Sequence, residues 1–236
     1  MGVNCGVCGT WFATPRARDQ HAEAKGHWQY ECDVCYDVFG DEQEREHHHV
    51  HDHHYCSHCD RSFQNLNNIK MHLNSSIHRG QNINCPSNCG NAFTTAAGAT
   101  AHLETGACPN APGVSRDDVY RLIRSKDPNS VISKKLIGWY GSETYEATNR
   151  TWNGPAYECY LCDRTFSRLA SLNQHLQSPA HQQDLYHCPN RGCAQEFKTL
   201  AALINHLESE SCGFMRFDAV QKQMSGLVSS NRLIGF

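Results

Sequence analysis

The sequence has neither of the features that direct a chain into or across a membrane. It begins Met1-Gly2-Val3-Asn4-Cys5, without a basic region followed by an apolar stretch, and no apolar run approaches transmembrane length. From these absences we expect a soluble, intracellular protein. In a reducing compartment its cysteines are expected to remain thiols rather than to form disulfides.

An excess of basic charge and the common catalytic motifs are also missing. The chain has 21 Lys and Arg against 24 Asp and Glu, a formal net charge of −3, whereas a general nucleic-acid binder is usually basic. It contains no Gly-rich phosphate loop and no nucleophile motif. We therefore expect no enzymatic activity, and any nucleic-acid surface has to be sought locally.

Cysteine and histidine, by contrast, are abundant, with 14 Cys and 16 His. They recur six times in one unit, which has a close Cys pair, a Phe four residues after the second Cys and a His thirteen residues after it. The pairs are Cys5 and Cys8, Cys32 and Cys35, Cys56 and Cys59, Cys85 and Cys89, Cys159 and Cys162, and Cys188 and Cys193. The aromatic residues are Phe12, Phe39, Phe63, Phe93, Phe166 and Phe197, and the histidines are His21, His48, His72, His102, His175 and His206.

A fourth metal-ligating residue follows the histidine of each unit. In five units it comes after five intervening residues and is His27, His78, Cys108, His181 or Cys212. All fourteen cysteines are then used, and a disulfide framework gives no reason for a Phe and a His at constant offsets. Two thiolates from a hairpin and two ligands from one helix face fit tetrahedral zinc, so we predict six structural Zn²⁺ ions with closed coordination.

The second unit leaves its fourth ligand open, because its helix ends in a histidine-rich tract. The register selects His48 as the first ligand, and its partner is either His53 or His54; we favour His53, which leaves two residues before Cys56. The surplus histidines could form a second metal site or a pH-sensitive site. A solvated turn is the simpler interpretation, since loose histidine tracts bind metal weakly.

These units resemble zinc fingers of the Cys2His2 and Cys2HisCys type over about two thirds of the chain, and the whole arrangement resembles uncharacterised fungal multi-finger proteins. The resemblance implies an α+β fold of small zinc-stabilised ββα modules. The connection at 79–84 is unlike the Thr-Gly-Glu-Lys-Pro linker of DNA-reading arrays. The long ligand spacing is instead similar to that of fingers in some double-stranded RNA-binding and pre-mRNA-processing proteins. We expect fingers at 1–30, 31–54, 55–80, 83–108, 157–183 and 186–212, an aromatic-rich connector at 139–156, and helical tails at 109–138 and 213–236.

A larger repeat relates the finger pair at 56–108 to the pair at 159–212, and a tail follows each pair. Apolar residues recur at helical spacing in both tails. They are Val119 and Ile123 in the first, and Val220, Met224, Leu227 and Val228 in the second. We expect each tail to dock on its own finger pair in a compact domain of about eighty residues, against the weakly polar helix starts at 95–98 and 199–202. The alternative is a free amphipathic tail that binds a partner.

Charge is distributed unevenly and separates the fingers by type of partner. Residues 1–54 carry four basic and ten acidic residues, residues 55–138 nine and five, and residues 139–236 eight and nine. The acidic helix at 41–46 is expected to repel phosphate and to meet a protein. Fingers 3 and 5 instead offer side chains of the kinds that read base edges, which are also ordinary on a helix surface. The candidates are Asn65, Asn68, Lys70, Arg168, Ser171 and Gln174.

From this pattern we predict a zinc-binding protein that binds DNA or structured RNA in a regulatory role. The alternative is a protein-interaction adaptor with purely structural zinc, which would use the acidic N-terminal fingers or the apolar tails. A zinc enzyme is the least favoured class, because catalytic zinc keeps an open coordination position. A nuclear location is inferred from the class of protein alone, since no basic import cluster stands out beyond Lys134-Lys135.

Overall fold

The structure, a computed structural model, describes residues 2–27, 30–136 and 141–229, with side chains in the last helix as far as Gln223. It divides into two compact units, residues 1–79 and residues 80–236. Within the described ranges no helix has the length and apolar character needed to cross a membrane. Each unit is described by itself.

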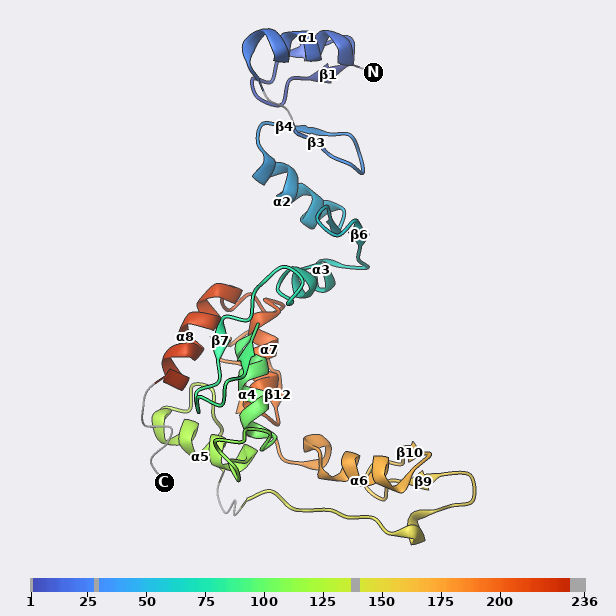
Figure 1. The fold of residues 1–236 in the computed structure, drawn as a ribbon, viewed down its shortest axis with the longest axis vertical. Helices are drawn as coiled ribbons and strands as arrows, with labels where there is room; N and C mark the ends of the chain where they lie inside the picture. Colours follow the sequence, from blue (N-terminus) through green and yellow to red (C-terminus); the bar gives the residue numbers. More distant parts are fainter. Residues whose placement is uncertain (1, 28–29, 137–140, 230–236) are drawn as a thin grey trace. The chain divides into compact units, whose positions relative to one another are not determined.

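Six hairpins, each followed by a helix, confirm the expected ββα modules (Figure 1). In the first unit these are β1 (Val3–Asn4), β2 (Trp11–Phe12) and α1 (Pro15–Lys25); β3 (Tyr30–Glu31), β4 (Val38–Phe39) and α2 (Glu42–Asp52); and β5 (Tyr55–Cys56), β6 (Arg61–Ser62) and α3 (Leu66–Leu73). In the second they are β7 (Ile83–Asn84), β8 (Ala92–Phe93) and α4 (Ala96–Glu104); β9 (Tyr157–Glu158), β10 (Thr165–Phe166) and α6 (Leu169–Gln177); and β11 (Tyr186–His187), β12 (Glu196–Phe197) and α7 (Leu200–Glu208). Beyond the fingers lie α5 (Arg116–Lys126), α8 (Phe217–Ser229) and two 3-10 turns, η1 (Asn149–Thr151) and η2 (Pro179–His181).

Local sequence explains where each module turns and where its helix starts. In fingers 1 to 5 the residue after the second cysteine adopts a left-handed conformation at the tip of the hairpin, as at Gly9 with φ 70°. Five of the six finger helices then begin at a Thr, Asp or Asn whose side chain accepts a backbone N–H of the first turn, while Arg168 of finger 5 makes no such bond. The Phe at constant offset packs on the first ligating histidine, with ring centroids 4.6 to 5.1 Å apart.

In the first unit, fingers 2 and 3 share a contact surface. Glu46 on α2 accepts a hydrogen bond of 2.8 Å from the hydroxyl of Ser57 in the finger 3 hairpin. His49 is fully buried and meets the ring of Tyr55 edge-on at 5.4 Å. These contacts fix the helix of finger 2 against the hairpin of finger 3.

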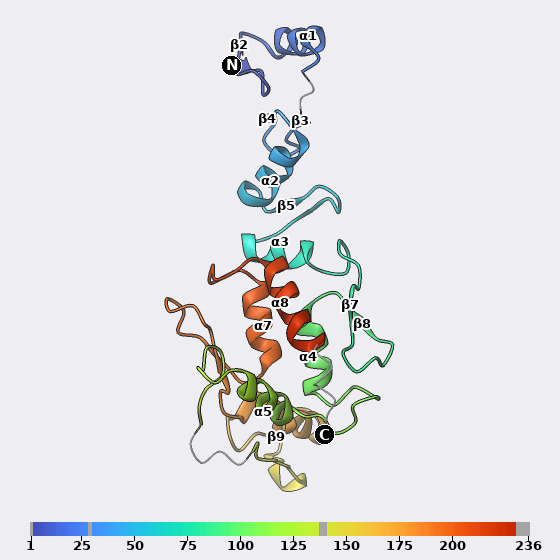
Figure 2. The same cartoon turned by 90° about the vertical axis from the view of Figure 1, so that its left-hand side faces the viewer.

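The second unit is organised around fingers 4 and 6, whose helices pack directly on each other (Figures 1 and 2). Helices α4 and α7 run antiparallel, because the last residue of each lies at the first turn of the other. Small and aliphatic side chains fill the contact. Ala96 and Ala97 of α4 belong to the same buried cluster as Leu200, Leu203 and Ile204 of α7.

Two buried glutamates close this helix pair in a reciprocal way. Glu104 accepts the N–H groups of Leu200 and Ala201 at 2.8 and 3.0 Å, and Glu208 accepts those of Ala96 and Ala97 at 2.8 and 3.2 Å. Each carboxylate therefore caps the N-terminus of the other finger's helix, where N–H groups lack helical partners. Burial raises the pKa of both carboxyl groups despite these bonds.

Both tail helices join this core, in an arrangement that differs from the expected pair of separate domains. Helices α5 and α8 each contact both α4 and α7. Residues 131–134 extend the finger 6 hairpin, with an antiparallel bridge between Ser133 and Tyr186. Finger 3 lies in the other unit. The expectation of one compact domain per finger pair is therefore wrong, because the small helix faces of fingers 4 and 6 complement each other.

The apolar stripes of the tails are covered by the chain itself as far as they are described. Val119, Ile123 and Val220 are at most 7 % exposed. The side chains of Met224, Leu227 and Val228 lie outside the described residues. Val119, Ile123 and Val220 therefore do not offer the free apolar surface that the alternative interpretation required.

Replacing Val220 by Asp is expected to lower the melting temperature of the second unit. A charge at a side chain that is 1 % exposed would face Leu203 and the rest of the core without a partner. Gln223→Asp on the exposed face of α8 is the matched control. NMR should show the loss in fingers 4 and 6, with finger 5 retained; equal melting of both variants would contradict the packing of α8.

Finger 5 is stabilised by the connector. The side-chain amide of Asn173 pairs with both backbone groups of Ala147, at 2.7 and 3.1 Å. Ala147 packs with Leu172 and Leu176 of α6, and in Figure 1 the connector runs along that helix. Trp152 contacts Tyr157 edge-on at 4.8 Å, whereas Trp139 and Tyr140 lie outside the described residues.

Candidate metal centres and nucleic-acid surface

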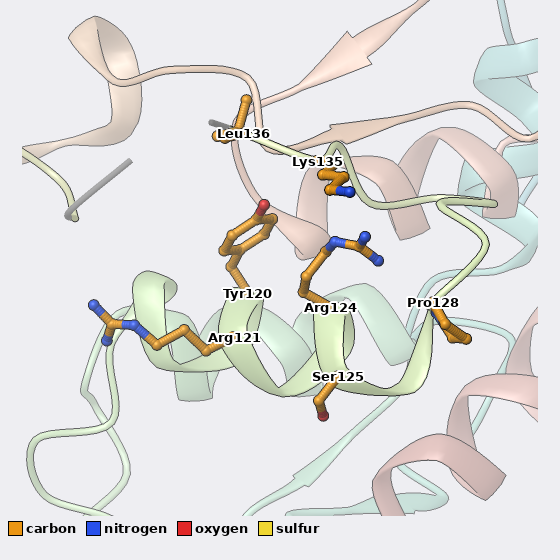
Figure 3. A pocket seen from close by; sticks show the side chains of 7 residues that line it. All are labelled: Tyr120, Arg121, Arg124, Ser125, Pro128, Lys135 and Leu136. Atoms are coloured by element: carbon orange, nitrogen blue, oxygen red, sulfur yellow. The ribbon is translucent and has the colours of Figure 1, made fainter. Parts of the chain in front are cut away.

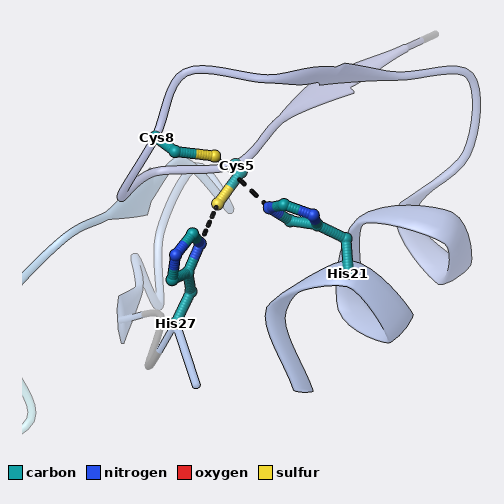
Figure 4. A group of neighbouring side chains, drawn as sticks. All are labelled: Cys5, Cys8, His21 and His27. Carbon is teal, nitrogen blue, oxygen red and sulfur yellow. Dashed lines mark hydrogen bonds between the residues drawn. The ribbon is translucent and has the colours of Figure 1, made fainter. Parts of the chain in front are cut away.

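Every finger gathers four Cys or His side chains at the junction of hairpin and helix. In finger 1 these are Cys5, Cys8, His21 and His27, which converge in Figure 4. In each such group the potential ligand atoms lie within 4.8 Å of one another. The next four groups are Cys32, Cys35, His48 and His53; Cys56, Cys59, His72 and His78; Cys85, Cys89, His102 and Cys108; and Cys159, Cys162, His175 and His181. In finger 6, Cys188 contacts Cys212 and Cys193 contacts His206 through the same kinds of atoms.

Distances within the groups fit tetrahedral zinc. Zn–S bonds of about 2.3 Å and Zn–N bonds of about 2.0 Å place two sulfur ligands roughly 3.8 Å apart and a sulfur and a nitrogen roughly 3.5 Å apart. Cys85 and Cys108 have their Sγ atoms 3.6 Å apart, and Cys188 and Cys212 have theirs 3.7 Å apart. The Sγ of Cys193 lies 3.5 Å from Nε2 of His206. The two sulfur–sulfur distances are far too long for disulfides, and all three distances suit a zinc ion coordinated by both atoms of each pair.

Zinc binding requires deprotonated cysteines, and burial works against deprotonation of some of them in the absence of metal, whereas hydrogen bonding with Thr10 lowers the pKa of Cys8 to about 6. Burial raises the pKa of Cys85 to about 11 and that of Cys188 to about 12. At neutral pH these thiols keep their protons until zinc displaces them. Acidification should therefore favour release of the metal, because protons compete for the same sulfur atoms.

In finger 2, His53 rather than His54 lies with the other three candidate ligands. Its Nε2 lies 3.0 Å from Nε2 of His48, while the carbonyl of His54 accepts the N–H of Phe63. Asp52 lies 2.9 Å from Nδ1 of His48 and thereby orients the ring, so that Nε2 faces the sulfur of Cys35 at 3.2 Å. A carboxylate on the second ring nitrogen is a common support for a zinc-bound histidine.

The first two fingers carry an arginine where the other fingers place an apolar side chain. Ile69, Ala99, Leu172 and Leu203 are buried at this helix position. Arg18 is also buried and pairs with Asp19 at 2.8 Å. Arg45 pairs with Glu46 at 3.1 Å and lies 5.9 Å from the Tyr30 ring. Their aliphatic stems therefore cover the small core while neighbouring carboxylates neutralise the charge.

The polar helix starts of fingers 3 and 5 remain accessible. Asn65 and Asn68 are exposed, although the side-chain oxygen of Asn65 also caps the N–H of Asn68 at 2.9 Å. Arg168 and Gln174 are exposed as well. Lys70 and Ser171 are half-buried, whereas Asn173 on the same helix as Ser171 is used by the connector.

The corresponding positions of fingers 4 and 6 are occupied by the other finger. Ala96, Ala97 and Leu200 are buried, and their N–H groups bind Glu208 or Glu104. Sequence reasoning did not identify these two glutamates. A signal was present, because only fingers 4 and 6 continue their histidine with Leu-Glu and close with a cysteine.

Comparison with known proteins places two of these modules in zinc-finger families. Residues 157–181 match a family described as a zinc finger of C2H2 type, and residues 53–79 match one described as a double-stranded RNA-binding zinc finger. Transcription factor IIIA of Rattus norvegicus and that of Mus musculus are each 38% identical to this chain over 42 residues, which cover 18% of this chain and 12% of the relative. The chain thus aligns with only about an eighth of the length of these relatives.

The matches and the Cys/His groups together show a C2H2-type multi-finger protein that holds structural zinc. Both relatives are mammalian, so the fungal resemblance stays a prediction.

Proposed function

We propose that this multi-finger chain binds nucleic acid, and that its ligand is double-stranded or otherwise structured RNA, contacted by the helix starts of fingers 3 and 5. The observation that carries the proposal is the contrast between fingers. Fingers 3 and 5 expose polar side chains at the helix start, whereas fingers 4 and 6 bury the same positions against each other. Fingers 3 and 5 therefore remain accessible to a ligand, whereas fingers 4 and 6 form the core of the second unit.

The choice of RNA rests on finger 3. Its match to a double-stranded RNA-binding family covers the whole module. In both finger 3 and finger 5 a serine lies three residues after the first ligating histidine, and its hydroxyl donates a hydrogen bond of 2.6 Å to the carbonyl of that histidine. This bond shapes the long turn to the second histidine. Residues 55–80 carry Arg61, Lys70 and Arg79 against Asp60, a local basic excess that suits a phosphate backbone.

Replacing Asn68 and Arg168 by Ala is expected to weaken binding of a duplex RNA about tenfold or more, because a polar contact at a nucleic-acid interface contributes roughly 1 kcal/mol or more. Fluorescence anisotropy with duplex RNA, duplex DNA and single-stranded RNA over a salt series measures this. Gln177→Ala, exposed on α6 near its C-terminus, is the matched control.

The wild-type affinity for duplex RNA should fall steeply with salt and exceed that for DNA of the same sequence, because the 2′-hydroxyl distinguishes the two. Salt-independent binding, or variants indistinguishable from the control, would contradict the proposal. A regulatory role and a nuclear location belong to the same proposal, supported by the similarity to transcription factor IIIA.

A second candidate function is an adaptor that binds a protein through finger 2. Asp41, Glu42 and Glu44 are all exposed at the start of α2 and are flanked by a segment of net negative charge. Such a surface repels phosphate and suits a basic polypeptide. Retained partner binding by the Asn68 and Arg168 variant, together with absent RNA binding by the wild type, would favour this function.

A further inference from the structure

The end of helix α5 is shaped by one carboxylate that folds the chain back over the helix. Asp127 accepts the backbone N–H groups of Val131, Ile132 and Ser133 at 2.7 to 2.9 Å and the Ser133 hydroxyl at 2.8 Å. Burial opposes ionisation of Asp127, but these bonds outweigh it and lower the pKa of the carboxyl to about 2. The carboxylate is therefore charged at neutral pH and committed to the turn.

The returning chain is held in extended form across α5. The Tyr120 hydroxyl donates a hydrogen bond of 2.5 Å to the Lys134 carbonyl. The Lys134 N–H donates one of 2.9 Å to the carbonyl of Leu185 in finger 6. The Lys134 ammonium lies 2.5 Å from the carboxylate of Glu196. Since successive side chains of an extended segment point to opposite sides, Lys135 is directed away from Glu196 and toward α5.

This geometry creates a pocket of about 630 Å³ between α5 and the returning chain (Figure 3). Its lining consists of Tyr120, Arg121, Arg124, Ser125, Pro128, Lys135 and Leu136. Three cations therefore line the pocket, and in Figure 3 the ends of Arg124 and Lys135 lie next to each other. Among the described residues no carboxylate lines the pocket, although Asp118 pairs with Arg121 at 3.1 Å.

Neighbouring like charges are unfavourable unless an anion binds between them. Arg124 uses one N–H on the Asp127 carbonyl, and a guanidinium has five, so donors remain for a ligand. Within the described residues the Lys135 ammonium has no acidic partner, because Glu196 and Asp127 are taken by Lys134 and the turn. A phosphate suits such a pair, since Arg presents a planar fork and Lys a point charge.

We propose that this pocket binds a phosphate group, with Arg124 and Lys135 as its principal contacts. Two sources share this chemistry: a backbone phosphate of the RNA that the fingers bind, and free phosphate or a mononucleotide. The first source rests on the proposed function, whereas the phosphate chemistry itself does not. The pocket would place a backbone contact on the core built by fingers 4 and 6, outside any finger helix.

Lys135→Gln is the central test, because Lys135 is exposed and its side chain carries none of the turn contacts. Zinc-loaded full-length protein is titrated with inorganic phosphate and with a duplex RNA. In the wild type, phosphate should shift the NMR signals of Arg124 and Lys135, and Lys135→Gln should weaken this binding at least tenfold. Lys135→Arg should restore it. Lys126→Gln, on the same helix but outside the lining, removes equal charge as the control.

The RNA arm separates the two sources. If the pocket holds a backbone phosphate, Lys135→Gln makes the fall of log affinity with log salt less steep by about one unit of slope, and the control does not. If phosphate shifts the pocket signals but RNA binding is absent or unchanged, the pocket serves free phosphate and the proposal of a phosphate site stands. Absence of any phosphate-dependent shift at Arg124 and Lys135 in the wild type would overturn it, whatever the RNA result.

Discussion

Removal of zinc by a chelator is expected to unfold fingers 1, 2 and 3 completely. In the described part of residues 1–79, Ala22 and Ile69 are the only aliphatic side chains that are buried, so no apolar core remains to hold these modules. A structural zinc site contributes about 10 kcal/mol or more of apparent binding free energy at neutral pH, which here is the folding free energy. The helical signal of α1, α2 and α3 should therefore be lost with the metal.

The second unit should lose its zinc with a different result. Fingers 4 and 6 share a cluster that includes Leu185, Leu203, Ile204 and Val220, and among its buried members only Cys188 is a candidate zinc ligand. We expect residual helical structure there after chelation. Circular dichroism and NMR during titration with a chelator, together with colorimetric measurement of released zinc, follow both units. Full retention of the unit 1 spectrum in zinc-free protein would contradict the assignment of zinc as the source of folding energy.

The order of zinc loss should follow exposure of the ligands. Cys8, Cys35 and Cys162 are exposed, whereas finger 4 buries both Cys85 and Cys108. A chelator reaches an exposed sulfur first, so fingers 1, 2 and 5 are expected to release zinc before finger 4.

Replacing both Glu104 and Glu208 by Ala is expected to destabilise the second unit by about 5 kcal/mol, a large share of the stability of an ordinary domain. Each substitution removes the buried carboxylate that accepts two backbone N–H groups, and each buried N–H left without a partner costs roughly 1 to 3 kcal/mol. The Ala96 N–H keeps a second acceptor, the side-chain oxygen of Gln221. The helix pair should separate, because the two caps lie at its opposite ends. Thermal and chemical denaturation of the double variant measures the loss.

The corresponding Gln variants show whether charge or hydrogen bonding matters more. Gln keeps only one side-chain oxygen as an acceptor. Glu208 accepts both of its N–H groups on Oε1, whereas Glu104 accepts one on each oxygen, so only Glu104→Gln loses a hydrogen bond. Burial already raises the pKa of both carboxyl groups, so loss of the charge itself should cost little. We expect Glu208→Gln to retain most of the stability and Glu104→Gln to lose part of it. Equal destabilisation by Gln and Ala would show that the ionised form is required, and no effect of Ala would contradict the capping role.

The metal centres were predictable from sequence because tetrahedral coordination fixes which positions of a hairpin and a helix can meet. Even the tract of finger 2 could be narrowed to His53 or His54, since only the chain length to Cys56 had to be considered. The contact of fingers 4 and 6 was not predictable in the same way. It joins residues such as Glu104 and Leu200 that lie 96 positions apart, and no local rule relates them.

The same limit explains why the tails were expected in two separate domains rather than in one shared core. Periodicity identifies an apolar face on α5, through Val119 and Ile123, but it does not say what covers that face. The weakly polar helix starts of fingers 4 and 6 were recognised as a docking surface for the tails. In the structure each of these helix starts also packs against the helix of the other finger. From their neighbours in sequence alone, Glu104 and Glu208 cannot be distinguished from ordinary surface glutamates, although both are buried.

The crosswise capping by Glu104 and Glu208 has a consequence for how this protein could have arisen. Each half of the repeat supplies one acceptor and one helix start, so a single half is self-complementary, as the subunits of a twofold homodimer are. Two separate halves would meet only at sufficient concentration. Joining them in one polypeptide makes the encounter intramolecular and independent of dilution, so gene duplication would have turned a reversible dimer into a permanent one.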